Sequence, residues 1–124
     1  MIRFINCVRR RADISTDEFR RFWNSPEFEF LFERLFLIVQ PRRFAKNLTL
    51  QVSANEQIRQ EQGSGEPFDG TFEYWWHDAS ELLEKYDSPE AQEIRQEMLE
   101  YQQQFIDIPN CRAFFTEYET KEFA

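Results

Sequence analysis

Several residue types that build common active sites are scarce in this sequence. It has one histidine, His77, and two cysteines, Cys7 and Cys111, whose spacing matches no metal-binding motif. We therefore expect free thiols and no metal site. Gly63 and Gly65 open no helix that carries a lysine, which excludes a phosphate-binding loop, and no serine is framed by glycines as a nucleophile. If the protein is an enzyme, we therefore expect it to need no cofactor and to act on an apolar substrate by acid–base or electrostatic catalysis.

Long apolar runs are also absent. No segment reaches the length that spans a bilayer, and the first residues lack the cationic end and apolar stretch of a secretion signal, so we expect a cytoplasmic protein. The formal net charge is −8. An acidic surface repels both phosphate backbones and anionic lipids, which argues against nucleic acid and membranes as partners.

The chain has 124 residues, of which 17% are aromatic. That length suits one domain, residues 1–124, and the aromatic content is far too high for a disordered protein. Alternation of apolar residues predicts four strands, at residues 2–9, 44–52, 71–77 and 112–119. Residues 54–67 are mostly polar and are expected to form a long loop, with or without a short helical turn.

Helix-start signals lie between these strands. Ser15 and Glu18 have the spacing of a capping box. Pro26 interrupts the helix, and Ser25 before it can serve as a new N-cap, so a kinked or broken helix that runs to about Val39 is expected. Further helices are expected at residues 80–86 and from Ser88 onward. The order strand, helix, strand, strand, helix, strand predicts an α+β, ferredoxin-like βαββαβ fold with a four-stranded antiparallel sheet and both helical layers on one face.

The strand residues divide by parity into two faces. The even-numbered face is nearly continuous and apolar and is expected to lie under the helices: Ile2, Phe4, Val8, Leu48, Leu50, Val52, Phe72, Tyr74, Trp76, Phe114 and Tyr118. The odd-numbered face is mixed but carries Ile5, Trp75 and Phe115. Each of these gains about 1.5–3 kcal/mol by burial. A contiguous patch of this kind indicates a homodimer in which two sheets meet face to face, whereas isolated aromatics on a monomer are the alternative.

Two polar residues stand out as candidate site residues. Asn6 is the polar exception on the apolar face, where its amide either bonds the backbone or orients a ligand. Glu27 is four residues after Trp23, so the two side chains can share a helix face. A carboxylate shielded by aromatics has a raised pKa and can move protons, although an ordinary acid in the first turn of a helix is the simpler interpretation.

An ordered set of motifs resembles EthD-type proteins along nearly the whole chain. The motifs are Arg9-Arg10-Arg11, Ser15-Thr16-Asp17-Glu18-Phe19, Phe22-Trp23, Pro67-Phe68-Asp69-Gly70, Glu73-Tyr74-Trp75 and Ser88-Pro89-Glu90-Ala91. The resemblance implies a dimeric α+β barrel of two ferredoxin-like subunits. It also implies relatives among cofactor-free isomerases, lyases and small proteins encoded beside oxygenases. Glu27 stands where this family usually has a histidine, so either Glu27 replaces it as the acid–base residue or the chemistry is lost.

Two functions remain open from the sequence. The first is a cofactor-free isomerase or lyase acting on a small apolar compound that is aromatic, lactone-like or polyketide-like. Its pocket would be lined by Phe4, Trp23, Tyr74 and Trp76, with Glu27 as acid or base and Asn6 positioning the substrate. The second is a non-catalytic dimer that binds an apolar ligand or assists an oxygenase.

Overall fold

The computed structural model describes residues 1–124. Four antiparallel strands form one sheet in the order β2-β3-β1-β4. Their bounds are β1 (Ile2–Val8), β2 (Arg43–Leu48), β3 (Gly70–Trp76) and β4 (Arg112–Glu117). The two central strands, β1 and β3, are neighbours although they are far apart in sequence, as the ferredoxin-like prediction requires. A short 3-10 turn, η1 (Ile108–Asn110), precedes β4.

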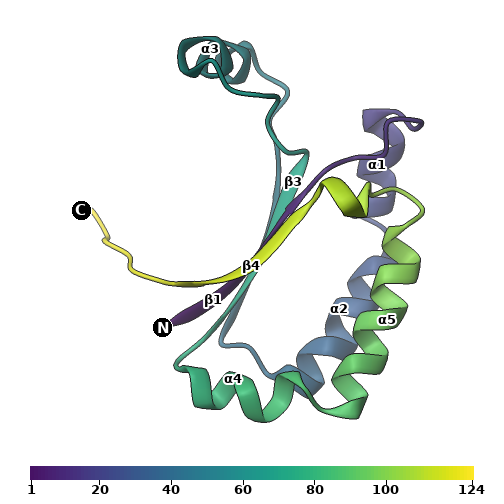
Figure 1. The fold of residues 1–124 in the computed structure, drawn as a ribbon, viewed down its shortest axis with the longest axis vertical. Helices are drawn as coiled ribbons and strands as arrows, with labels where there is room; N and C mark the ends of the chain where they lie inside the picture. The colour runs from purple at the N-terminus through teal and green to yellow at the C-terminus, as the bar shows by residue number, and fades with distance from the viewer.

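Four helices cover one side of this sheet, with α2 and α5 packed together (Figure 1). They are α1 (Thr16–Trp23), α2 (Pro26–Val39), α4 (Ala79–Tyr86) and α5 (Pro89–Gln102). The predicted starts are confirmed: the hydroxyls of Ser15, Ser25 and Ser88 each accept a hydrogen bond from the backbone N–H three residues on. The N-cap at Ser25 makes α2 a separate helix from α1.

The segment expected to be a loop contains a ten-residue helix, α3 (Ser53–Gln62). Its Glu, Gln and Ala residues are good helix formers, but it has no apolar stripe and buries no residue, so periodicity did not reveal it. The second strand was also predicted too long: β2 ends at Leu48, and Leu50 and Val52 are exposed, not under the helices. We call residues 49–68 the α3 arm, which projects from the sheet on the side away from α2 and α5 (Figure 1).

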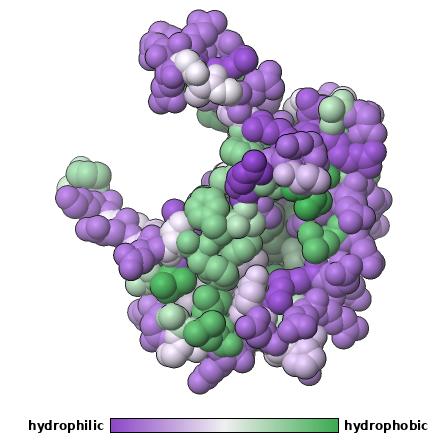
Figure 2. All heavy atoms as spheres, in the orientation of Figure 1, coloured by the Kyte–Doolittle hydropathy of each residue, from purple (hydrophilic) through white to green (hydrophobic).

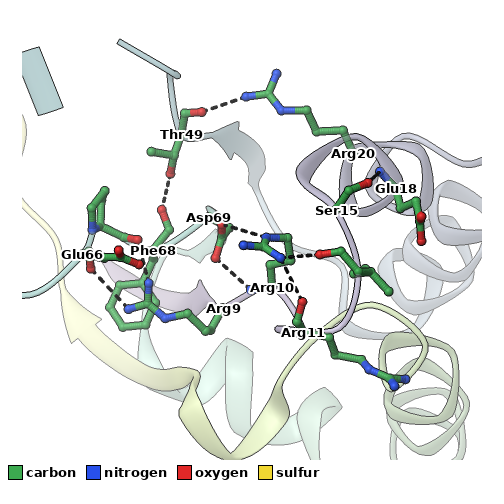
Figure 3. Close-up of polar contacts among 12 residues, drawn as sticks. Arg9, Arg10, Arg11, Ser15, Glu18, Arg20, Thr49, Glu66, Phe68 and Asp69 are labelled. Carbon is green, nitrogen blue, oxygen red and sulfur yellow. Dashed lines mark hydrogen bonds and ion pairs between the residues drawn. The ribbon is translucent and has the colours of Figure 1, made fainter. Parts of the chain in front are cut away.

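Hydrogen bonds fix the base of the α3 arm (Figure 3). The Arg9 guanidinium donates to the carbonyl of Pro67 at 2.6 Å, and the Arg20 guanidinium donates to the carbonyl of Thr49 at 2.9 Å. The Thr49 hydroxyl donates in turn to the carbonyl of Phe68. The two ends of the arm are therefore tied to each other and to the helical layer.

Strand register shows that the parity prediction holds for β1 and β3 but is wrong for β4. Phe4 lies opposite Tyr74 and Phe115, so these three side chains face the helices. Phe114, expected under the helices, lies opposite Ile5 on the outer face of the sheet. Residue parity does not carry across a loop, because the turn before β4 sets the phase of the strand.

The outer face also differs in detail from the expectation. Trp75 is there as predicted, but it is only 5% exposed, since the ring of Tyr118 packs against it at 5.4 Å. Tyr118 therefore lies on the outer face and not under the helices. Arg3 forms a cross-strand ion pair with Glu73 at 3.5 Å. Exposed apolar surface on this face is provided mainly by Phe114, which is 48% exposed.

One hydrophobic cluster of 17 buried residues joins the sheet to the helices. Aromatic rings dominate its centre, where Phe28 packs edge-to-face on Phe72 at 6.4 Å and Phe32 packs on Phe72 at 5.1 Å. None of the helices combines the length and the apolar character needed to cross a membrane.

Gly70 generates a stability prediction, because a Cβ there would lie 2.9 Å from the carbonyl oxygen of Asn47 and 3.0 Å from the ring of Trp23. We expect Gly70→Ala to lower the free energy of unfolding by about 1–3 kcal/mol, measured by urea denaturation, because backbone or a packed indole must move. Gly65→Ala is the control, since nothing lies within 4 Å of its added Cβ. Equal stability of the two variants would contradict the tight packing at Gly70.

Candidate functional site

A cavity of about 400 Å³ lies between the helix-facing side of the sheet and α5. Figure 2 shows an apolar patch over β4 and a hollow between it and α5, on the side where the cavity opens. Thirteen residues line the cavity, and ten of them are hydrophobic. Its aromatic walls are Phe4, Phe72, Tyr74, Tyr86 and Phe115, and its three polar residues are Asn6, Arg95 and Gln102. Phe114, on the outer face of the edge strand β4, also borders the cavity. Such a mostly apolar cavity with few polar groups is the usual form of a small-molecule site.

Asn6 reaches the cavity because β1 alternates and places it on the same face as Phe4. Its Oδ1 atom is buried and has no hydrogen-bond partner. An unsatisfied buried polar group costs about 1–3 kcal/mol, and a donor from a bound molecule would remove that cost. The sequence left open whether the Asn6 amide bonds the backbone or orients a ligand. Its oxygen forms no bond with the backbone.

Tyr74, predicted to line the pocket, does line the cavity and adds a phenol to it. Phe4 stacks on its ring at a centroid distance of 4.9 Å, which fixes the position of the phenol. Burial raises the pKa of Tyr74 well above its ordinary value. The phenol is therefore protonated at neutral pH, so it can donate a hydrogen bond but is no base there.

Arg95 and Gln102 were missed by sequence reasoning. They are seven residues apart on α5 and so lie on one side of that helix, next to its buried stripe. The Arg95 guanidinium lies 4.0 Å from the ring centroid of Tyr86 and donates to the carbonyl of that residue. Gln102 is only 4% exposed. In the sequence nothing distinguishes these two from the other polar residues of the helix.

Two predicted lining residues, Trp23 and Trp76, belong to the core and not to the cavity. Both are almost completely buried, and the Trp76 indole N–H donates to the carbonyl of Val39 at 2.8 Å. Trp23 closes the end of α1, where its carbonyl accepts a hydrogen bond from the Lys46 ammonium. That ammonium lies 5.2 Å from the Trp23 ring centroid, and burial lowers the pKa of Lys46.

Glu27 is separated from Phe4, Asn6 and Tyr74. It is exposed in the first turn of α2 and borders a different depression, of about 490 Å³, together with Ser25 and Tyr101. The Tyr101 hydroxyl bonds the Ser25 hydroxyl and donates to the carbonyl of Phe22 at 3.2 Å. Burial raises the pKa of Tyr101, and the nearby charge of Glu27 adds to that rise.

The ionisable side chains that line the cavity are of only two types, tyrosine and arginine. Its lining includes tyrosines and one arginine but no aspartate, glutamate or histidine. No group of three or more His, Cys, Asp or Glu residues is placed to hold a metal ion, and Cys7 and Cys111 are free thiols. The arrangement can bind and orient polar atoms of an apolar molecule and can stabilise negative charge, but it offers no carboxylate or imidazole for proton transfer.

The sequence matches no protein-family model, and no curated protein sequence is significantly similar to it. Solved structures are similar in fold. An ethyl tert-butyl ether D (EthD) family protein from Bacillus halodurans superimposes with a TM-score of 0.59 at 10% identity, covering 96% of this chain and 99% of that chain. A hydroxynitrile lyase from Passiflora edulis gives a TM-score of 0.61 at 15% identity, covering 98% of this chain and 96% of that one.

A third similar structure comes from Bacteroides fragilis and is described as a dimeric protein of unknown function with a ferredoxin-like fold. It has a TM-score of 0.58 at 13% identity and covers 94% of this chain and 95% of that chain. At these identities the likeness concerns the fold alone. The chain is an α+β protein with the ferredoxin-like fold that an EthD family protein also has.

Proposed function

We propose that this protein binds a small, mostly apolar molecule in the cavity between the sheet and α5. The observation that carries the proposal is the aromatic cavity itself, which is lined by Asn6, a residue whose buried Oδ1 has no hydrogen-bond partner within the chain. A side chain that only packed the core would be apolar here, since an unsatisfied amide destabilises the fold. A bound molecule with a hydrogen-bond donor would satisfy Asn6, while its apolar body would lie against rings such as Phe4 and Phe115.

The chemistry that we propose is a cofactor-free isomerase or lyase reaction on an aromatic, lactone-like or polyketide-like compound. The Tyr74 phenol and the Asn6 amide would orient oxygen atoms of the substrate, and Arg95 would stabilise negative charge that develops in the transition state. The fold supports this proposal in a general way, because it is shared with a protein named as a hydroxynitrile lyase.

A non-catalytic ligand-binding or oxygenase-accessory protein is the second candidate. It is favoured by the lack of aspartate, glutamate and histidine in the cavity lining, because general acid–base catalysis usually depends on one of these groups. Under this candidate the cavity would hold and shield its ligand, and the reaction would occur elsewhere.

We further propose that the whole chain, residues 1–124, forms a homodimer through the outer face of the sheet. A protein with this fold is described as dimeric. Ile5 and the exposed Phe114 provide apolar surface on this face, which no helix covers. The α3 arm and the C-terminal segment both extend on this side of the sheet, away from the helical layer (Figure 1). Free cysteines fit a cytoplasmic location for this dimer.

The ligand site is tested by blocking the cavity. Ala113 lines the cavity on β4 and is exposed, so Ala113→Trp can fill its mouth without overpacking the core. We expect this variant to bind N-phenyl-1-naphthylamine, a neutral apolar fluorophore, about tenfold or more weakly than the unaltered protein, because the probe loses apolar contact area. Ala54→Trp, on the exposed α3, is the matched control. Unchanged probe affinity in Ala113→Trp would remove the cavity from the proposal.

The dimer is tested by placing a charge on the outer face. Phe114→Glu is expected to convert a dimer into a folded monomer at micromolar concentration, measured by light scattering coupled to size exclusion, because a carboxylate would be buried between the two sheets. Phe30→Glu is the matched control, since Phe30 is 58% exposed on α2. A monomeric unaltered protein would refute the face-to-face dimer.

The acid–base role of Glu27 stays a prediction and has its own test. Because Glu27 borders a separate depression, we expect Glu27→Gln to leave binding of the naphthylamine probe unchanged. With a substrate in hand, loss of turnover in Glu27→Gln would move the reacting site to the depression beside Ser25 and Tyr101. Full turnover would exclude Glu27 as the proton carrier.

A further inference from the structure

We propose that the ligand of the cavity is an apolar carboxylic acid, bound as its anion by Arg95. This inference rests on the proposed function and narrows its ligand class. Arg95 is the one cationic residue among the thirteen that line the cavity, and no acidic residue is among them. A positive charge that faces an otherwise uncharged, aromatic cavity attracts an anion, because no acidic side chain of the lining offsets it.

The charge of Arg95 is not neutralised within the chain. No carboxylate oxygen lies within ion-pairing distance of its guanidinium, whereas an arginine of the neighbouring helix is paired. Arg34 on α2 forms an ion pair with Glu97 of α5 at 2.5 Å. Glutamates are abundant on α5, so the isolation of Arg95 follows from its direction toward the cavity and not from a lack of acids nearby. The titratable groups that face it there are Tyr74 and Tyr86.

The guanidinium is also held in place before any ligand arrives. It lies 4.0 Å from the centroid of the Tyr86 ring, and one of its nitrogens donates to the Tyr86 carbonyl. Arginine has five N–H donors in a rigid fork that matches the two oxygens of a carboxylate. Because Tyr86 uses only part of this fork and limits its motion, little conformational entropy is lost when a carboxylate binds.

The other residues that line the cavity favour an acid whose remaining part is apolar. Arg95 lies on α5, whereas Phe4, Phe72 and Phe115 lie on the sheet, so a molecule bound between them meets charge on one wall and aromatic rings on the other. The net charge of −8 repels small hydrophilic anions from the protein as a whole. An acid therefore needs substantial apolar surface to bind, which excludes small hydrophilic acids.

The test compares an acid with its neutral ester. Displacement of bound N-phenyl-1-naphthylamine is measured with 1-naphthoate and with methyl 1-naphthoate. We expect the unaltered protein to bind the acid about tenfold or more tightly than the ester, the ratio typical of a charge-assisted hydrogen bond. Arg95→Gln is expected to abolish this preference and Arg95→Lys to keep part of it, with circular dichroism confirming that each variant is folded. Lys121→Gln, in the exposed C-terminal segment, changes the net charge equally and is expected to keep the full preference.

The outcomes separate this inference from the proposal beneath it. Binding of the naphthylamine with no preference for naphthoate in the unaltered protein overturns the role of Arg95 and leaves the cavity as an apolar site. A preference that survives in folded Arg95→Gln, or one that falls equally in Lys121→Gln, also overturns it. Failure of the naphthylamine to bind at all refutes the proposed ligand site, and the inference with it.

Discussion

The register of β1 between β3 and β4 is the constraint on which the other features depend. It places Phe4 opposite Tyr74 and Phe115, and therefore puts three aromatic rings and the neighbouring Asn6 on the side that faces the helices. A slip of one residue in either ladder would turn that strand's whole set of side chains to the opposite face. The backbone hydrogen bonds of the sheet thus fix both the walls of the cavity and the composition of the outer face.

The cavity is lined by polar side chains that are not fully paired within the chain, and the well-packed core beside it supplies the stability of the fold. The unsatisfied oxygen of Asn6 reduces stability in the absence of a ligand, and Arg95 has no ion-pair partner within the chain. Trp23 and Trp76, expected to line the cavity, are instead part of the buried core. The Trp23 carbonyl accepts a hydrogen bond from Lys46, and the Trp76 indole donates one to a backbone carbonyl. Destabilising polar groups inside well-packed surroundings are typical of functional sites.

Strand β4 links the cavity to the outer face. Its consecutive residues Phe114 and Phe115 point to opposite sides of the sheet, so one strand contributes to the proposed dimer contact and to the cavity wall. As the edge strand it has no neighbour beyond it, which leaves the cavity open on that side (Figure 2). The α3 arm is fixed at its base but buries no residue of its helix, so apolar residues of the arm, such as Ile58, are exposed.

The sequence by itself determined the order of the four strands and of the helices that cover them, the helix starts at Ser15, Ser25 and Ser88, and the fold class, because caps and apolar periodicity act over a few residues. It also identified Asn6 as a polar exception on an apolar face. It could not reveal α3, whose residues favour a helix but show no apolar stripe, nor the facing of Phe115, which depends on the phase of a turn. Only the tertiary structure decided that Glu27 lies apart from the cavity and that Arg95 lines it, because which helix side chains meet the sheet depends on how α2 and α5 dock, and docking is set by contacts between residues far apart in the chain.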